Sequence, residues 1–306
     1  MSLPATVVHS SEIEERLGLA PDWIERRTGI RARRIAAADE RLEEHATAAA
    51  QAALDDAGVD GKDLDLVLVA TTTADEVMPT AGPLVASAVG AHRAGAFDIG
   101  AACTGFLSGL ATGVAMIDAG RASNILVVGA DFMSRIVDPQ DRGTAAVFAD
   151  GAGAVVLVAT GEPSRVGPVV LGAKGDVAGT IRLTHEQRTI EMRGHETYKE
   201  AVACLSQSTE AAAEAAGVGL DEIDLFVYHQ ANGRILAAVA ERLGLDHDRV
   251  VDCIAEYGNT SAATLPLALA LSVEDGRLRE GDRVLLGTFG AGLTWGATVL
   301  EWGLPA

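Results

Sequence analysis

The stretch Ala94-Gly-Ala-Phe-Asp-Ile-Gly-Ala-Ala-Cys-Thr-Gly-Phe106 is a short apolar run that ends in a cysteine and leads directly into a helical pattern. Residues 97–101 predict a buried strand, and apolar residues then recur at helical spacing from Phe106 to Ile117, before the stop signal Gly120. Cys103 is therefore expected at a strand-to-helix turn. Backbone N–H groups and the helix dipole favour a thiolate there, which suits a nucleophile. The competing interpretation of a lone cysteine is a small buried hydrophobe.

Length and composition favour an α/β protein. The 306 residues suffice for two ordinary domains or one large one, and 34 glycines with only 4% aromatic residues fit tight turns between Val/Leu/Ala-rich strands. A total of 24 Lys and Arg residues against 43 Asp and Glu residues gives a formal net charge of -19. This charge argues against a general nucleic-acid-binding or anionic-membrane surface, so an anionic ligand must meet a local basic patch.

The three cysteines, Cys103, Cys204 and Cys253, lie far apart without CxxC spacing, so we expect neither a disulfide framework nor a metal site. No apolar run approaches the length of a membrane span, and residues 1–8 lack the basic head and long apolar stretch of a signal peptide. The sequence therefore predicts a cytoplasmic protein without bound metal or membrane contact.

The two halves of the chain resemble each other. Three pairs of similar segments carry the repeat: 57–69 with 216–228, 118–129 with 274–287, and 153–157 with 296–300. Repetition at this scale in a chain of βαβ character indicates a duplicated α/β unit rather than a solenoid, whose period is far shorter. We expect an N-terminal half at 1–163 and a C-terminal half at 164–306, related by a pseudo-twofold axis.

Three polar residues fall where predicted strands end. Cys103 follows a strand of the first half, His229 follows the strand 223–228, and Asn259 lies just beyond a predicted strand at 250–254. Reactive groups collect at the carboxyl ends of strands in parallel α/β sheets, so a pseudo-twofold arrangement would bring these loops to one site. Taken singly, a histidine is more often structural and the asparagine of Gly-Asn-Thr more often a turn residue.

Several segments resemble the β-ketoacyl-acyl-carrier-protein synthase III family of thiolase-fold condensing enzymes, in the family's order over almost the whole chain. They are Ala-Ala-Cys-Thr-Gly-Phe at 101–106, His-Gln-Ala-Asn at 229–232, Tyr-Gly-Asn-Thr-Ser-Ala-Ala at 257–263 and Phe-Gly-Ala-Gly-Leu-Thr-Trp-Gly at 289–296, together with 23–31 and 138–144. The resemblance implies a thiolase-like fold of five αβαβα layers.

The chemistry of the three polar residues agrees with that resemblance. A cysteine can take an acyl group as a thioester, and a neutral histidine with an asparagine amide can donate hydrogen bonds to the enolate formed when malonyl loses carbon dioxide. We therefore assign Cys103, His229 and Asn259 as catalytic. By resemblance, the backbone N–H groups of Cys103 and Ala291 form the oxyanion hole. The Gly-Ala-Gly turn at 290–292 also suits a hairpin corner, and both interpretations can hold together.

The arginines at 26–34 are the one dense positive cluster on this acidic chain. Solvated surface arginines are the common explanation, yet coenzyme A carries several phosphate charges that guanidinium pairs well. The family places Trp23 and Arg27 on the nucleotide with Arg142 nearby, and Asn232 on the pantetheine arm. The resemblance thus implies acyl-CoA as a substrate and no bound cofactor.

Further positions are assigned by resemblance alone. Lys199 and Arg234 match positions that dock the acidic acyl carrier protein, although Glu241 falls where the family often has a basic residue. Met78 matches a residue that crosses a dimer interface to close the partner's acyl pocket, with ordinary core packing as the alternative. Phe148 is the other acyl-pocket candidate.

Two departures from the family pattern stand out. Residues 2–4 stand where the pattern has its first strand, so we expect that strand to be absent and its loss to fall at a sheet edge. The region 174–194 is several residues shorter than usual, and in the family it helps to wall the acyl pocket. The nature of the acyl group is therefore the least determined property.

We interpret the sequence as a homodimeric condensing enzyme that joins an acyl-CoA starter to malonyl-acyl carrier protein, with loss of carbon dioxide, through an acyl-cysteine. One alternative is an acyltransferase that loads a starter through Cys103 without decarboxylation and primes a polyketide or other secondary pathway. The other is a non-catalytic partner subunit, against which the intact Cys103, His229 and Asn259 argue.

Overall fold

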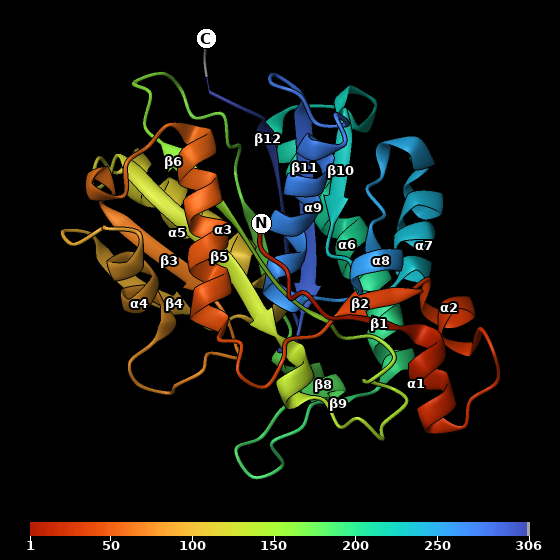
Figure 1. Cartoon of the computed structure of the whole chain (residues 1–306). Helices are drawn as coiled ribbons and strands as arrows, with labels where there is room; N and C mark the ends of the chain where they lie inside the picture. Colours follow the sequence, from red (N-terminus) through yellow and green to blue (C-terminus); the bar gives the residue numbers. More distant parts are fainter. Residues whose placement is uncertain (305–306) are drawn as a thin grey trace.

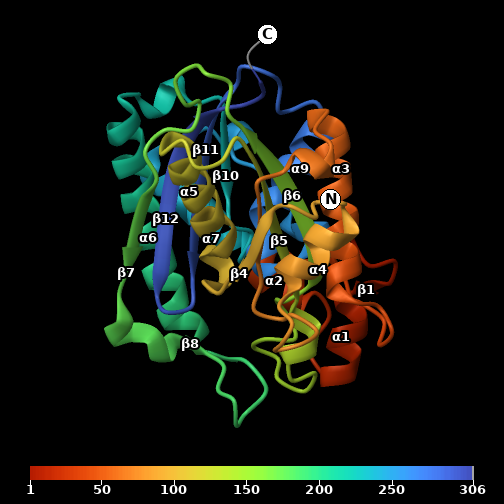
Figure 2. The ribbon, with the colours of Figure 1, turned by 90° about the vertical axis from the view of Figure 1, so that its left-hand side faces the viewer.

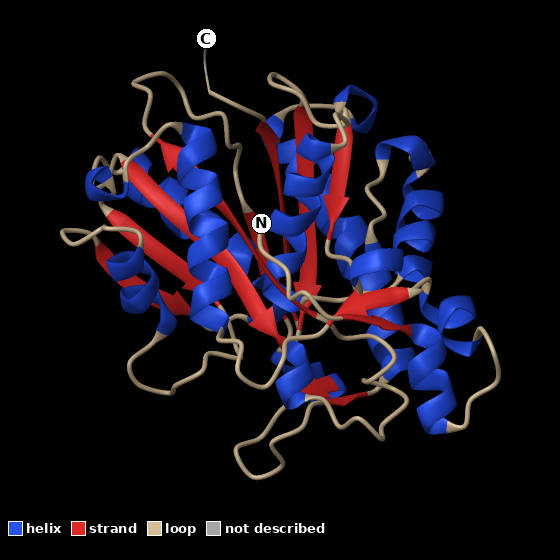
Figure 3. Ribbon diagram, in the orientation of Figure 1, coloured by secondary structure: helices blue, strands red, loops and turns tan. Residues whose placement is uncertain are grey.

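The computed structural model describes residues 1–304 and contains two mixed four-stranded sheets with helices between and outside them (Figures 1 and 3). The first sheet has the order β4-β3-β5-β6. Strand β3 pairs in parallel with β4 and β5, and β6 pairs antiparallel with β5. The strands are β3 (Leu66–Ala70), β4 (Gly95–Ile99), β5 (Asn124–Phe132) and β6 (Asp150–Val158).

The second sheet has the order β10-β11-β12-β7 and repeats the central pairing of the first. Strand β10 is parallel to β11, whereas β12 is antiparallel to both β11 and β7. Its strands are β7 (Val170–Ala173), β10 (Leu225–Tyr228), β11 (Arg283–Gly290) and β12 (Thr294–Glu301).

Helices fill three further layers, which Figure 2 shows edge-on. Between the sheets lie α5 (Gly105–Asp118) and α9 (Thr264–Glu274). The outer face of the first sheet is covered by α3 (Leu42–Ala57) and α4 (Ala81–Ala88), and that of the second by α6 (Gly194–Ala216) and α7 (Gly233–Leu243). The result is the αβαβα sandwich expected from the sequence.

The central layer is tightly packed because α5 carries glycine on the face toward the first sheet. A Cβ atom at Gly109 would lie 3.0 Å from Val127 Cγ1, and one at Gly113 would lie 2.7 Å from Leu157 Cδ1. Large apolar side chains on the remaining faces of α5, among them Phe106 and Leu110, join a core shared by both sheets. The two halves are thus packed through one continuous apolar layer.

Smaller elements gather at the lower end of both sheets in Figure 1. Helix α8 contacts β2, and β1 pairs antiparallel with β2. A separate apolar cluster that includes Ile24, Phe148 and Ile254 packs this region. The elements are β1 (Val7–His9), α1 (Ser10–Leu17), α2 (Trp23–Thr28), β2 (Ala32–Arg34), β8 (Ile181–Arg182), β9 (Glu191–Met192) and α8 (Ile254–Tyr257).

The predicted strand at 250–254 is wrong. Only Val250 makes a β-bridge, to Phe226, and α8 begins at Ile254. The reason lies in the Gln230 side chain, which donates to Val251 O and accepts from Cys253 N, both at 2.9 Å. Hydrogen bonds to the Gln230 side chain therefore take the place of the strand-to-strand hydrogen bonds that a strand at 250–254 would make.

The free edge of β6 carries a single bridge, in which Ser2 N donates to Ala152 O and Ala152 N donates to Ser2 O. In the second sheet, β7 occupies the corresponding edge along β12. A cavity of about 940 Å³ runs beside β6 and is lined by residues such as Val156, Leu269 and Trp302.

Within residues 1–304, no helix is both long and apolar enough to cross a membrane, and no cluster of side chains there is suited to hold a metal ion. The short region 174–194 contains a 3-10 segment, Gly175–Thr180, and the β8–β9 pair.

Candidate active site

Cys103 lies in a 3-10 turn, Ala102–Thr104, between the end of β4 and the start of α5. The turn is anchored to the second sheet, since Thr288 Oγ1 donates to Cys103 O at 3.0 Å and the Thr104 and Thr294 hydroxyls lie 2.9 Å apart. Ala102 has φ of +46°, a conformation that costs energy outside glycine and concentrates at functional sites. The predicted strand-to-helix position of the cysteine is thus confirmed.

The end of β11 approaches Cys103 directly. A Cβ atom at Gly290 would lie 3.1 Å from both Cβ and N of Cys103, so only glycine fits without displacing the nucleophile. Ala291 follows in the turn between β11 and β12, which is also the predicted hairpin corner. The two backbone segments assigned to the oxyanion hole are therefore neighbours.

His229 follows β10, and its backbone N–H donates to Gly287 O at 2.8 Å. Its ring is only 1% exposed and packs edge-on against Phe289, with centroids 5.4 Å apart. Burial lowers the pKa of His229 to about 3, so the imidazole is neutral at physiological pH. Nδ1 has no hydrogen-bond partner among the described residues.

Asn259 is fixed by a parallel bridge to Phe148, in which Asn259 N donates to Val147 O and Ala149 N donates to Asn259 O. The side-chain Oδ1 accepts from Ser261 N at 2.9 Å. Because this bond engages the oxygen, both N–H groups of the amide remain for another partner. The side chain is thus oriented as a donor.

Cys103 is half-buried as a residue, and burial around its thiol raises its pKa to about 12. The nearby Asp131 carboxylate acts in the same direction, while a hydrogen bond with the Ser261 side chain opposes it. The resting residue is therefore a neutral thiol, not the thiolate expected from its place before α5. Ser261 also links Cys103 to the Asn259 loop.

These contacts bring the three predicted catalytic residues to one place between the sheets. Gly290 touches Cys103, its neighbour Phe289 touches His229, and Ser261 connects Cys103 with Asn259. The cavity beside β6 is separate from this site, because none of the described residues that line it is Cys103, His229 or Asn259.

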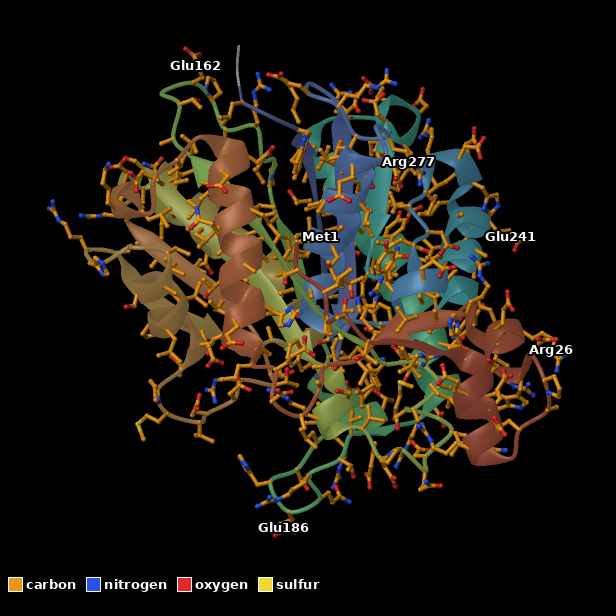
Figure 4. The ribbon with its side chains drawn as sticks, in the orientation of Figure 1. Met1, Arg26, Glu162, Glu186, Glu241 and Arg277 are labelled. Atoms are coloured by element: carbon orange, nitrogen blue, oxygen red, sulfur yellow. The ribbon has the colours of Figure 1, made fainter. Side chains whose placement is uncertain are left out.

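The four residues assigned to coenzyme A form one surface cluster. The Arg27 guanidinium lies 4.3 Å from the centre of the Trp23 ring, and that of Arg142 lies 5.9 Å from it. Asn232 caps α7 by accepting from Arg234 N, and its Nδ2 donates to Arg27 O at 3.2 Å. The neighbouring Arg26 projects from α2 toward solvent (Figure 4).

Both residues assigned to carrier docking are exposed and lie close to Tyr198. Lys199 follows it on α6, and the Arg234 guanidinium on α7 lies 6.0 Å from the centre of its ring. Glu241 lies further along α7 and is exposed (Figure 4).

The two acyl-pocket candidates have different surroundings. Phe148 is 5% exposed and is bridged to Asn259. Met78 is 85% exposed, so the alternative of ordinary core packing is wrong for the single chain.

Two polar residues of the site were not singled out from the sequence: Asp131, the next-to-last residue of β5, and Ser261, whose φ is +52°. A carboxylate after the apolar run Ile-Leu-Val-Val-Gly-Ala at 125–130 is the one available signal, because a charge at the end of a buried strand needs partners. Nothing local marks Ser261.

A cysteine before a central helix, together with a neutral histidine and a donor amide from the second half of the chain, defines a condensing enzyme of the thiolase fold. The family model of 3-oxoacyl-[acyl-carrier-protein] synthase III matches residues 97–175, and the model of the C-terminal part of that enzyme matches 213–302. The chain belongs to this family and is an acyltransferase, as the sequence predicted.

Individual relatives agree with that assignment. The chain is 47% identical over 302 residues to β-ketoacyl-[acyl-carrier-protein] synthase III 2 of Streptomyces coelicolor, covering 98% of this chain and 91% of the relative. The 3-oxoacyl-[acyl-carrier-protein] synthase III of Aquifex aeolicus superposes with a TM-score of 0.95 at 38% identity, covering 98% and 97%. A priming β-ketosynthase of the R1128 polyketide pathway also gives 0.95, at 34% identity, covering 99% and 94%.

Proposed function

We propose that the chain condenses an acyl-CoA with malonyl-acyl carrier protein, giving a 3-oxoacyl-acyl carrier protein, carbon dioxide and free coenzyme A. The carrying observation is the meeting of an acyl-accepting thiol with two neutral donors. His229 is held uncharged by burial, and Asn259 presents its N–H groups because Ser261 engages its oxygen.

In the first half-reaction, the sulfur of Cys103 attacks the acyl-CoA thioester. The new S–C bond forms as the bond to the coenzyme A sulfur breaks, and the proton of Cys103 ends on the departing thiol. Backbone N–H groups of Cys103 and Ala291 stabilise the oxyanion of the tetrahedral intermediate. Gly290 lets the β11 backbone approach Cys103 closely, because a Cβ atom there would lie 3.1 Å from Cys103 Cβ and N.

In the second half-reaction, Asn259 Nδ2 and His229 Nε2 donate to the carbonyl oxygen of the malonyl thioester. The bond to the carboxylate breaks, carbon dioxide leaves, and the enolate carbon attacks the acyl group as the bond to Cys103 sulfur breaks. The departing Cys103 thiolate takes up one proton from solvent, which restores the neutral thiol. Donation from Nε2 requires the tautomer in which Nε2 carries the proton and Nδ1 is bare.

The substrate ends are assigned to the surface clusters described above. The nucleotide of coenzyme A meets Trp23, Arg27 and Arg142, and Asn232 meets the pantetheine arm. Lys199 and Arg234 receive the acidic carrier protein. This part of the proposal is supported by the arginine–indole contacts on an otherwise acidic chain.

We also propose a homodimer formed along β4. This strand ends the first sheet, and within residues 1–304 it pairs only with β3. Phe97 on it is 45% exposed, and the nearby segment carries Val77 at 96% and Met78 at 85%. An open edge with exposed apolar side chains favours pairing with a second copy. In such a dimer, Met78 would close the partner's acyl pocket, which Phe148 lines from within the chain.

The division into halves at 1–163 and 164–306 is kept as part of the proposal. It is supported by the break between the sheets, since β6 ends at Val158 and Val166 already bridges to Leu300 of the second sheet.

Intact-protein mass spectrometry with a panel of acyl-CoAs tests the acyl-enzyme. One acyl group should add to the unmodified protein, to Cys204→Ser and to Cys253→Ser, but not to Cys103→Ser. Labelling that persists in Cys103→Ser would end the assignment, and the mass added names the starter.

Release of labelled carbon dioxide from malonyl-acyl carrier protein tests condensation. His229→Ala and Asn259→Ala should still accept acyl groups, while carbon dioxide release falls on the order of 100-fold to 1000-fold, because each removes one preorganised donor. An unmodified protein that releases none, yet passes its acyl group to another acceptor, would instead be a priming acyltransferase.

A further inference from the structure

Asp131 is the next-to-last residue of β5, and its side chain is completely buried. A buried carboxylate is costly unless it is compensated, and within residues 1–304 no ion pair to Asp131 is found. Hydrogen bonds provide the compensation. Their distribution shows which parts of the protein depend on this side chain.

The two carboxylate oxygens bind two different loops. Oδ1 accepts from Thr72 N at 2.8 Å, from Thr73 Oγ1 at 2.9 Å, and from the Thr71 and Thr72 hydroxyls at 3.2 and 3.3 Å. Oδ2 accepts from Ala262 N at 3.1 Å. The side chain therefore joins the loop after β3, which leads to Met78, to the loop that carries Asn259.

The Asn259 loop needs such an anchor. Ser261 has φ of +52°, which costs energy for a residue with a side chain. In this conformation Ser261 N reaches Asn259 Oδ1, and the Ser261 side chain reaches Cys103. The next backbone N–H, that of Ala262, is the one bound by Asp131.

The loop also lies directly on β5. A Cβ atom at Gly129 would come within 2.3 Å of Ala262 O, so the two backbones are in contact two residues before Asp131. The end of β5 thus fixes how closely the Asn259 loop packs on the sheet, through Gly129. It also fixes the orientation of the loop, through the hydrogen bond from Ala262 N to Asp131.

We propose that Asp131 is a positioning residue for the condensation step: by holding Ala262 it keeps Ser261 in its strained conformation, and Ser261 in turn orients the Asn259 amide toward the malonyl thioester. This inference rests on the proposed function, because it concerns the donor that decarboxylation requires. Asp131 itself contacts no substrate.

The neighbouring strand offers a matched control. Asp150 is also completely buried, begins β6 opposite Phe132, and accepts from Ala36 N and Ser134 N, both at 2.8 Å. Among the described residues, its side chain forms no hydrogen bond with the Asn259 loop. Asp150→Asn therefore carries the general cost of altering a buried carboxylate without releasing Ala262.

The test compares Asp131→Asn with Asp150→Asn, with rates expressed per site that accepts an acyl group from acyl-CoA. In Asp131→Asn the amide oxygen should stay with the four donors of the threonine loop, so the NH2 group faces Ala262 N, which loses its acceptor. Carbon dioxide release should then fall on the order of tenfold or more, as for a misaligned donor. Acylation of Cys103 should fall much less. Asp150→Asn should retain the full rate of release per site.

A second readout is the pH profile of Cys103 alkylation by iodoacetamide. Asp131 is the charged side chain that acts on this thiol among the described residues, and His229 beside it is neutral. Loss of the negative charge should therefore move the profile to lower pH in Asp131→Asn and leave it in place in Asp150→Asn. A purely structural role would not move it.

The inference is overturned if release per site is unchanged in Asp131→Asn, or falls equally in Asp150→Asn. If Asp131→Asn does not fold, hydrogen exchange of the unmodified protein decides: the Ala262 amide must exchange far more slowly than exposed loop amides, and fast exchange would refute the anchor. Exchange and alkylation need no malonyl chemistry, so they test Asp131 even if the unmodified protein releases no carbon dioxide and the proposed function fails.

Discussion

Replacing Gly290 by alanine should slow the acylation of Cys103 while leaving the protein folded. The added Cβ atom would lie 3.1 Å from Cβ and N of Cys103 and 3.4 Å from its Cα, closer than ordinary contact. The cysteine turn must therefore yield by a few tenths of an ångström. Since a misplacement of about 1 Å costs on the order of 100-fold, this shift should slow acylation roughly fourfold to tenfold.

The assay is the rate at which acyl mass appears on the protein after mixing with acyl-CoA, followed by quenched mass spectrometry. Gly100→Ala is the control, because it lies three residues before Cys103 and a Cβ atom there meets nothing within 4 Å. It should acylate at the unmodified rate. Equal rates in Gly290→Ala and the unmodified protein would refute the close approach, and equal slowing in both variants would point to a general effect on the loop.

Further predictions concern charge. Arg27→Ala should weaken binding of acyl-CoA by roughly tenfold to 100-fold, the cost of a charged hydrogen bond, and affect acyl-pantetheine much less; isothermal titration that finds equal losses would indicate a folding role. Because burial lowers the pKa of His229 to about 3, carbon dioxide release should show no His229 titration between about pH 5 and 8. In the unfolded chain, His229 takes up a proton at about pH 6.5, whereas in the folded protein it stays neutral down to about pH 3. Its contribution to the free energy of unfolding is therefore complete above about pH 6.5 and declines toward pH 3, by at most about 1.4 kcal/mol per pH unit. Urea titrations of His229→Gln should lack this part of the pH dependence. Alkylation of Cys103 should keep rising up to about pH 12, and a plateau near pH 8 would contradict the enclosed thiol.

Much of the fold follows from local pattern. Helix α3 (Leu42–Ala57) has a local signal in the sequence, because its alanine-rich segment ends at Gly58, which adopts φ of +64° as glycine readily does after a helix. The turn at Cys103 is likewise predicted locally, because a short apolar run before it changes to apolar residues at helical spacing after it. The strand expected at 250–254 does not form, since that segment is bound by a side chain from Gln230, which no period in the segment itself reveals.

Only those site residues whose side chains have a recognisable chemical role could be predicted from the sequence. Cys103, His229 and Asn259 were chosen as reactive groups at strand ends, and the structure gathers them. Asp131 and its partner Ala262 are 131 residues apart, so their contact exists only after both sheets have packed. The same holds for the thiol of Cys103, whose pKa depends on an enclosure that a sequence does not display.

The Trp23 ring lies against the guanidinium groups of Arg27 and Arg142. One guanidinium lies 4.3 Å and another 5.9 Å from its centre, so a base that stacks on the indole must displace Arg27, Arg142 or both. An exposed cation–π contact stabilises by only about 0.5–1 kcal/mol, and the displaced guanidinium can gain a phosphate in exchange. In the proposed coenzyme A site, entry of the nucleotide would therefore exchange a contact between arginine and indole for one between arginine and phosphate.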